Sequence, residues 1–306
     1  MLEETRQFNA RLEELLASLP PVNVLGAVET RRARAEGRSI FPPSVVLPEG
    51  RNRLVPGRAG DVGVRVFLPR EVTGVFLHVH GGGWVLGGAD QQDVSLWRLA
   101  TEARQAVVSV DYRLAPEHPY PAGLEDCEDA ALWLVEHARS EFGTSSLSIG
   151  GESAGAHLAV LTLLKLRDRH GVRDAFGAAS LVFGCYDLSM TPSQRRWGER
   201  YLVLSGPVMR WFTEQFLPDV DPEALRSPEI SPLYADLAGL PPAQFVAGTL
   251  DPLLDDSLFM AARWEAAGNE SRLLVYPEAV HGFTAFPIQV AEQANQARID
   301  FLSAPR

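Results

Sequence analysis

Short apolar segments alternate with longer helical ones along most of this 306-residue chain. Glycine, proline and other turn residues bound the apolar segments, which lie at 75–79, 106–110, 146–149, 181–183, 244–247 and 273–276. Parallel strands buried on both faces have such continuous apolar sequences, and they need long crossover connections that are usually helical. The alternation therefore predicts an α/β protein with a mostly parallel sheet covered by helices.

The remaining periodic segments divide the chain into a helical N-terminus and a larger compact unit. Apolar residues at helical spacing fall within 8–16 and end at two prolines, whereas 62–68 alternates as a half-buried strand does. Helices are predicted at 91–103, 124–138, 153–169, 258–267 and 288–302. We expect N-terminal cap helices at 1–43 and a main domain at 44–306, with a cap insertion at about 188–235.

Composition narrows the class of partner. The formal net charge is -11, whereas nucleic acids and anionic membranes require a clustered basic surface. The first 17 residues lack the unbroken apolar run of a signal peptide, and no window reaches the roughly 18 apolar residues of a membrane span. Cys127 and Cys185 form no metal-ligand spacing. We expect a cytoplasmic protein that binds neither nucleic acid nor membrane.

The strongest chemical signal is Gly-Glu-Ser-Ala-Gly at 151–155. It directly follows the predicted strand at 146–149 and directly precedes a predicted helix. A G-x-S-x-G segment between a strand and a helix is a nucleophile elbow, in which small residues permit a tight turn that exposes the serine hydroxyl. The sequence therefore predicts Ser153 as a nucleophile, with the dipole of the following helix directed at its oxygen.

A serine hydroxyl needs a base to take its proton, and in this kind of turn the base follows the serine in the chain. Only His157, His170 and His281 come after Ser153. His157 is one turn along the same helix, and His170 lies at the end of that helix before a glycine. His281, in a loop after the strand at 273–276, is the predicted base.

The base in turn needs an acid that fixes its tautomer. Asp251 follows the strand at 244–247 and precedes His281 by 281 - 251 = 30 residues. Asp255 and Asp256 are rivals, but they fall where the next helix begins and are typical of first-turn acids. Asp251 is the predicted acid.

Backbone donors for a developing oxyanion are predicted in the run His80–Gly83, because consecutive glycines let the main chain approach a substrate oxygen. The amide of Ala154 is a further donor. His78 and His80 share one face of an extended segment but lack a third ligand, so no metal site is expected. The run matches no phosphate-binding motif either, and no cofactor is expected.

Together these motifs resemble those of the hormone-sensitive-lipase-like carboxylesterases. The resemblance includes His80–Gly83, the segment 111–119 (DYRLAPEHP), the elbow, Asp251-Pro252-Leu253 and His281-Gly282-Phe283. It implies an α/β-hydrolase fold with an eight-stranded core and a helical cap, no cofactor, and hydrolysis of short- to medium-chain esters of small molecules. It also implies oxyanion donors at Gly82, Gly83 and Ala154, and it allows a homodimer formed through an exposed edge strand.

Substrate specificity is less constrained than the chemistry. Glu152 stands where many relatives carry Asp, and Ala156 where many carry Gly, from which we expect altered substrate orientation. The residues expected to line the substrate pocket are Trp84, Glu152, Trp211, Phe212, Phe216 and Phe283. An amidase or small-molecule deacetylase using the same three side chains is an alternative, as is a non-catalytic ligand-binding receptor.

Overall fold

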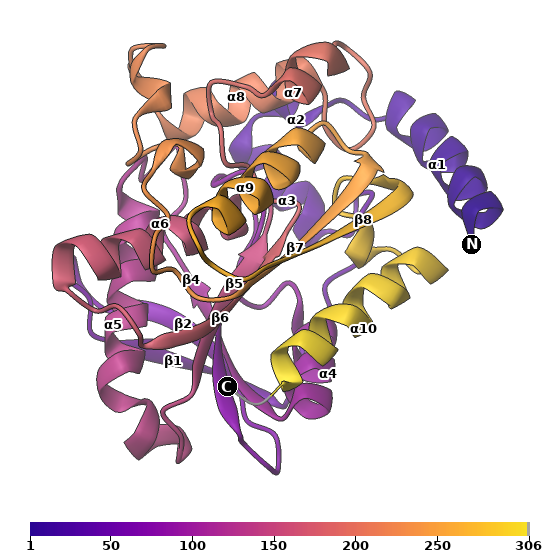
Figure 1. Ribbon diagram of the computed structural model, residues 1–306. Helices are drawn as coiled ribbons and strands as arrows, with labels where there is room; N and C mark the ends of the chain where they lie inside the picture. Colours follow the sequence, from indigo (N-terminus) through magenta and orange to yellow (C-terminus); the bar gives the residue numbers. More distant parts are fainter. Residues whose placement is uncertain (305–306) are drawn as a thin grey trace.

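An eight-stranded sheet forms the centre of the computed structural model, which describes residues 1–304 (Figure 1). The strand order is β1-β2-β4-β3-β5-β6-β7-β8, and β2 alone runs antiparallel to its neighbours. The strands are β1 (Gly50–Val55), β2 (Val62–Phe67), β3 (Gly74–Val79), β4 (Gln105–Asp111), β5 (Leu147–Glu152), β6 (Phe176–Val182), β7 (Ala243–Leu250) and β8 (Ser271–Val280). The predicted fold class, a mostly parallel α/β-hydrolase sheet, is confirmed.

Two strands differ from the sequence-based expectation. No apolar run marked β1, because this edge strand contains Arg51 and Arg53 and exposes most of its residues to solvent. Strand β6 begins at Phe176, five residues before the predicted start at 181, because the small residues at 177–180 do not form a long apolar run. Both differences follow from the same limit: strand signals depend on large apolar side chains.

Helices cover both faces of the sheet (Figure 1). Helices α4 and α10 pack on one face, where Phe67, Phe76 and Leu99 form a buried cluster with Ile299. Helices α5, α6 and α9 pack on the other face, over the largest apolar core. Their bounds are α4 (Asp93–Ala103), α5 (Ala122–Phe142), α6 (Ala154–His170), α9 (Leu254–Ala266) and α10 (Gln289–Ser303).

The N-terminal helices pack on two parts of the molecule, one of them an inserted helix and the other the edge of the sheet (Figure 1). Helix α2 contacts α8, α7 contacts α8 and α9, and α1 packs on β8 and α10. These helices are α1 (Leu2–Ala17), α2 (Val22–Leu25), α3 (Ala27–Ala35), α7 (Pro192–Trp197) and α8 (Gly206–Phe216). Across residues 1–304, none of the helices combines the length and apolarity needed to cross a membrane.

Asp256 ties the start of α9 to the inserted segment. Like Asp255, it lies in the first turn of its helix, as expected from the sequence. Its Oδ1 accepts hydrogen bonds from the backbone amides of Tyr186 (2.7 Å) and Asp187 (3.0 Å). Its Oδ2 accepts from Thr191 Oγ1 (2.8 Å) and Gln194 Nε2 (2.7 Å). Because Asp256 is fully buried, no water can replace it as the acceptor for these four donors.

We expect Asp256→Ala to lower the free energy of unfolding by about 3 kcal/mol, because it leaves several buried donors without an acceptor. Urea denaturation followed by circular dichroism measures this loss. Glu265→Ala, at an exposed position on the same helix, is the control and should change stability by less than about 0.5 kcal/mol. Equal stability of the two variants would contradict an anchoring role for Asp256.

Candidate active site

Ser153 occupies a strained turn between β5 and α6. Its backbone has φ 55° and ψ -120°, a conformation that side chains rarely adopt. The flanking glycines explain how the turn fits: a Cβ added to Gly151 or to Gly155 would lie 2.0 Å from the carbonyl oxygen of Val79. Only glycine permits this approach, so the turn holds the serine side chain away from the sheet.

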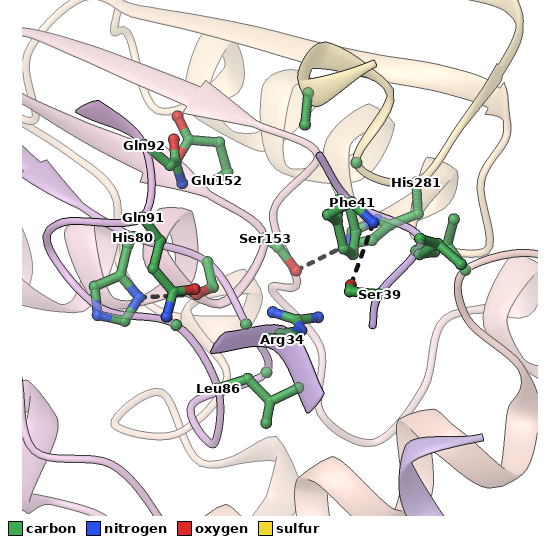
Figure 2. A pocket seen from close by; sticks show the side chains of 18 of the residues that line it. Arg34, Ser39, Phe41, His80, Leu86, Gln91, Gln92, Glu152, Ser153 and His281 are labelled. Carbon is green, nitrogen blue, oxygen red and sulfur yellow. Dashed lines mark hydrogen bonds between the residues drawn. The ribbon is translucent and has the colours of Figure 1, made fainter. Parts of the chain in front are cut away.

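Three side chains from separate loops form one hydrogen-bonded chain. Ser153 Oγ lies 2.9 Å from Nε2 of His281 (Figure 2). The other ring nitrogen, Nδ1, lies 2.9 Å from Oδ2 of Asp251. The aspartate is 2% exposed and the histidine 6%, so both are largely removed from water. In this arrangement the carboxylate holds Nδ1 protonated and leaves Nε2 free to accept the serine proton.

The ends of β7 and β8 position Asp251 and His281. The pairing of these strands shifts register between Gly248 and Leu250, so that Leu250 pairs with Val280. Asp251 directly follows β7 and His281 directly follows β8, so the two residues lie side by side at the carboxyl ends of these strands. The backbone amide of Leu253 donates to Asp251 Oδ1 (2.8 Å), which fixes the carboxylate. The ring of Phe183 packs edge-on against the ring of His281, with ring centroids 4.9 Å apart.

The glycine run after β3 lies beside the elbow. Gly82 (φ 124°) and Gly83 (φ 61°) have positive φ, and neither amide donates a backbone hydrogen bond within residues 1–304. A Cβ on Gly82 would lie 2.1 Å from the Leu86 carbonyl oxygen. His80 Nδ1 lies 2.8 Å from the Gly81 oxygen, and the Tyr112 hydroxyl donates to the His80 carbonyl (2.9 Å). These contacts hold the run in place while leaving its amides available to a ligand.

Next to Ser153 in the chain, Glu152 belongs to a buried charge network. Its carboxylate pairs with the guanidinium of Arg298 and with Nε2 of His78 (2.9 Å). Nδ1 of His78 lies 2.8 Å from Ser109 Oγ. Burial by itself would raise the pKa of the Glu152 carboxyl, but Arg298 and His78 outweigh burial and hold that pKa well below its ordinary value. Glu152 therefore stays ionised at neutral pH.

A cavity of about 1000 Å³ opens on Ser153 and His281 (Figure 2). Of the residues expected to line a substrate pocket, Trp84, Glu152 and Phe212 line this cavity. His80, Gly82, Gly83 and Ala154 line it as well. The predicted nucleophile, base and oxyanion donors therefore share one space with three of the predicted pocket residues.

Trp211, Phe216 and Phe283 were also expected to line a pocket, but they are not among the described residues that line this cavity. Phe216 instead stacks on Trp84, with ring centroids 4.6 Å apart. Phe283 is fully buried beside Phe183. Trp211 directly precedes Phe212 on α8. Because consecutive helical residues project about 100° apart, its side chain points in a different direction from that of Phe212, which lines the cavity.

The sequence predicted cap helices at 1–43, but not which of their residues line the cavity. Leu16, Leu19, Arg34, Ser39 and Phe41 all line the cavity. The signal available was the helical spacing of apolar residues near the N-terminus, without enough apolar residues for a separate core. That pattern indicated packing on the main domain, but not on which part of it.

The remaining histidines after the elbow have structural contacts. His157 Nδ1 accepts from Trp84 Nε1 (3.1 Å), and its Nε2 lies 2.7 Å from the Ile230 carbonyl oxygen. His170 pairs with Glu128. In the described part of the chain, no group of three or more His, Cys, Asp or Glu side chains is arranged to hold a metal ion.

Comparisons with known proteins point to one class of enzyme. A family model described as the alpha/beta hydrolase fold matches residues 76–285. Carboxylesterase NlhH of Mycobacterium tuberculosis is 35% identical over 290 residues, which cover 92% of this chain and 90% of that protein. An ethyl acetate hydrolase of Pseudomonas putida is 30% identical, with coverage of 93% and 91%. A hyperthermophilic esterase from the archaeon Pyrobaculum calidifontis superposes with a TM-score of 0.86 at 30% identity, covering 97% of this chain and 96% of its own.

The Glu152 network predicts a pH-dependent loss of stability. Because the folded-state pKa of Glu152 lies below its unfolded value, its ionised form stabilises the protein above about pH 4.5, and that contribution is lost as the pH falls further. We expect Glu152→Gln to be less stable than wild type at pH 7, by roughly 3 kcal/mol, because it leaves Arg298 without its counter-ion. The difference should narrow below pH 4.5, as measured by urea denaturation at several pH values.

Glu14→Gln is the matched control, since Glu14 is exposed on α1 and forms no ion pair with any described residue. Its stability should follow that of wild type at every pH. A constant difference between wild type and Glu152→Gln from pH 7 to pH 3.5 would show that the charge of Glu152 contributes nothing.

Proposed function

This chain belongs to the α/β-hydrolase fold family, among the hormone-sensitive-lipase-like carboxylesterases, and we propose that Ser153, His281 and Asp251 carry out its hydrolysis of carboxylic esters. The observation that carries the proposal is the continuous hydrogen-bonded chain from the Ser153 hydroxyl through His281 to Asp251. All three residues come from loops at the carboxyl ends of strands.

The reaction proceeds by two acyl transfers. Ser153 Oγ attacks the ester carbonyl while His281 Nε2 takes its proton, and the same nitrogen then protonates the departing alcohol. Water repeats the sequence on the acyl-enzyme and releases the acid. Asp251 remains ionised and stabilises the imidazolium that forms in each step. An ordinary serine would be too weak a nucleophile without this base.

The oxyanion of each tetrahedral intermediate is stabilised by the amides of Gly82, Gly83 and Ala154. The first two have no competing backbone acceptor within residues 1–304, and the third is the first residue of α6, where helical amides lack an intrahelical partner. The positive end of the α6 dipole adds to this stabilisation. These donors are already oriented before substrate arrives, which is the condition for a large electrostatic effect.

The cavity is suited to short- to medium-chain acyl groups. Trp84, Leu204, Met209 and Phe212 provide apolar wall, and a volume of about 1000 Å³ lies in the upper range for small-molecule sites. Residues 1–43 and the insertion at about 188–235 act as a cap over the rest of the main domain, which comprises residues 44–306. This division is supported by the contacts of α2 with α8 and by the N-terminal residues along the cavity.

The partner is a small-molecule ester, and the protein functions in the cytoplasm without nucleic acid or membrane. A net charge of -11 disfavours polyanionic partners. Cys127 and Cys185 are free thiols, which suits a reducing compartment.

Hydrolysis of 4-nitrophenyl esters with acyl chains of two to twelve carbons tests the reaction and sizes the pocket. We expect kcat/KM to peak at a short or medium chain. Ser153→Ala should lower kcat by about 10,000-fold or more, because it removes the nucleophile. Asp251→Asn should lower kcat by about 10,000-fold, because it no longer holds His281 in the tautomer that accepts the serine proton. Release of 4-nitrophenolate measures the chain-length dependence of kcat/KM and the loss of kcat in the variants.

Ser140→Ala, at an exposed position on α5, is the control and should keep wild-type rates. A Ser153→Ala variant that still turns over at a tenth of the wild-type rate would rule out Ser153 as the nucleophile. If the corresponding 4-nitroanilides were cleaved faster than the esters, the amidase alternative would replace the esterase proposal.

The exposed edge of the sheet supports a homodimer formed through β8. This strand ends the sheet, and its Leu273 and Val275 are 37% and 40% exposed. We expect light scattering after size exclusion to give twice the mass of the chain. Val275→Lys should shift the protein to monomer, because an edge lysine opposes strand pairing. Leu54→Lys on the other edge strand should not. A wild-type monomer would refute the proposal.

A further inference from the structure

Arg34, near the end of α3, projects into the same cavity as the nucleophile. Figure 2 shows its guanidinium in the cavity onto which the Ser153 hydroxyl also opens, and both residues line this space. The guanidinium carbon lies 5.1 Å from the centre of the Phe41 ring, which supports its plane from one side. Within residues 1–304 the Arg34 side chain has neither a hydrogen bond nor an ion pair, so its donors are available to a ligand.

Every other charged side chain along the cavity has a partner. Arg38 pairs with Glu36, Asp93 with Arg65, Arg98 with Glu292, and Glu152 with Arg298. Arg34 is therefore the one cavity cation in the described part of the chain without a counter-ion. The chain as a whole carries 39 acidic against 28 basic residues, so a shortage of carboxylates does not explain it.

The unpaired guanidinium keeps its charge in this position. Burial lowers the pKa of Arg34 to about 10, opposed by a weaker interaction with Tyr201, and this value is still far above neutral pH. A partly buried cation without a counter-ion is unfavourable for the folded protein. A ligand anion that enters the cavity would remove that penalty, and it would do so beside the reacting serine.

We propose that Arg34 is a specificity-determining residue that binds a carboxylate on the substrate, so that the preferred esters carry a free carboxylate besides the ester group that is cleaved. Monoesters of short dicarboxylic acids are the simplest members of this class. The inference rests on the proposed function, because the carboxylate that Arg34 binds belongs to the same ester that Ser153 cleaves. A carboxylate suits the site because two parallel N–H groups of a guanidinium bind both of its oxygens.

Matched pairs of esters test the inference. For the acyl side, 4-nitrophenyl glutarate monoester is compared with 4-nitrophenyl valerate, which has the same chain length and no charge. For the alcohol side, O-butyrylglycolate is compared with propyl butyrate. We expect wild type to favour the charged member of at least one pair. Arg34→Met should lower the charged-to-neutral ratio of kcat/KM at least tenfold, mainly through KM, and Arg34→Lys should restore part of it.

Arg32→Met is the matched control. It removes the same charge from the same helix, but Arg32 is exposed and pairs with Glu29 and Glu36 at the surface. The charged-to-neutral ratio of kcat/KM for Arg32→Met should equal that of wild type. Circular dichroism and thermal melting establish that each variant is folded, and Arg34→Gln serves if the methionine variant is not.

An unchanged ratio for both ester pairs in folded Arg34→Met or Arg34→Gln overturns the inference, as does an equal loss on charged and neutral esters. If no ester is hydrolysed by wild type, the proposed function fails instead. Calorimetric titration of glutarate into Ser153→Ala and into Ser153→Ala/Arg34→Met then decides the inference independently. Binding that is lost in the double variant supports it, and equal or absent binding in both overturns it.

Discussion

The close approach of the Val79 carbonyl to the elbow is the constraint on which the site depends. This oxygen ends β3, and it would lie 2.0 Å from a Cβ on either Gly151 or Gly155. Such contact forces glycine at both positions and brings β5, the turn and α6 against the neighbouring strand. The chain continues from Val79 directly into the His80–Gly83 run. One packing contact therefore sets both the strained serine and its distance from the free glycine amides.

Much of this arrangement could be predicted from the sequence because its signals are local. Central strands such as β3 and β7 are continuous apolar runs, and parallel strands end at one edge of a sheet. Once Ser153, Asp251 and His281 were placed after such strands, their proximity followed from topology. The edge strand β1 could not be predicted in this way, because its solvent-exposed arginines give no apolar pattern.

The lining of the cavity could not be predicted, because it depends on how helices distant in sequence pack together. Phe212 and Phe216 lie one turn apart on α8, yet Phe212 lines the cavity and Phe216 stacks on Trp84. Helical periodicity distinguishes an apolar face from a polar one, but it does not tell a core-facing residue from one that faces a cavity. The N-terminal residue Phe41 lines the cavity while its ring stacks on Phe286, a contact between residues 245 positions apart in the sequence.

Two charged side chains that line the cavity, Glu152 and Arg34, illustrate how differently a folded protein can treat an ion. Glu152 pairs with Arg298 and is hydrogen-bonded to His78, so the protein itself supplies the partners of its charge. Among residues 1–304, the guanidinium of Arg34 has only the face of Phe41 and an electrostatic interaction with Tyr201. An unpaired charge is stabilised when a ligand of opposite charge binds, and not when a neutral ligand binds. This difference in binding free energy distinguishes one substrate from another. The network around Glu152 therefore maintains the geometry of the elbow, while the unpaired guanidinium across the cavity can discriminate between ligands.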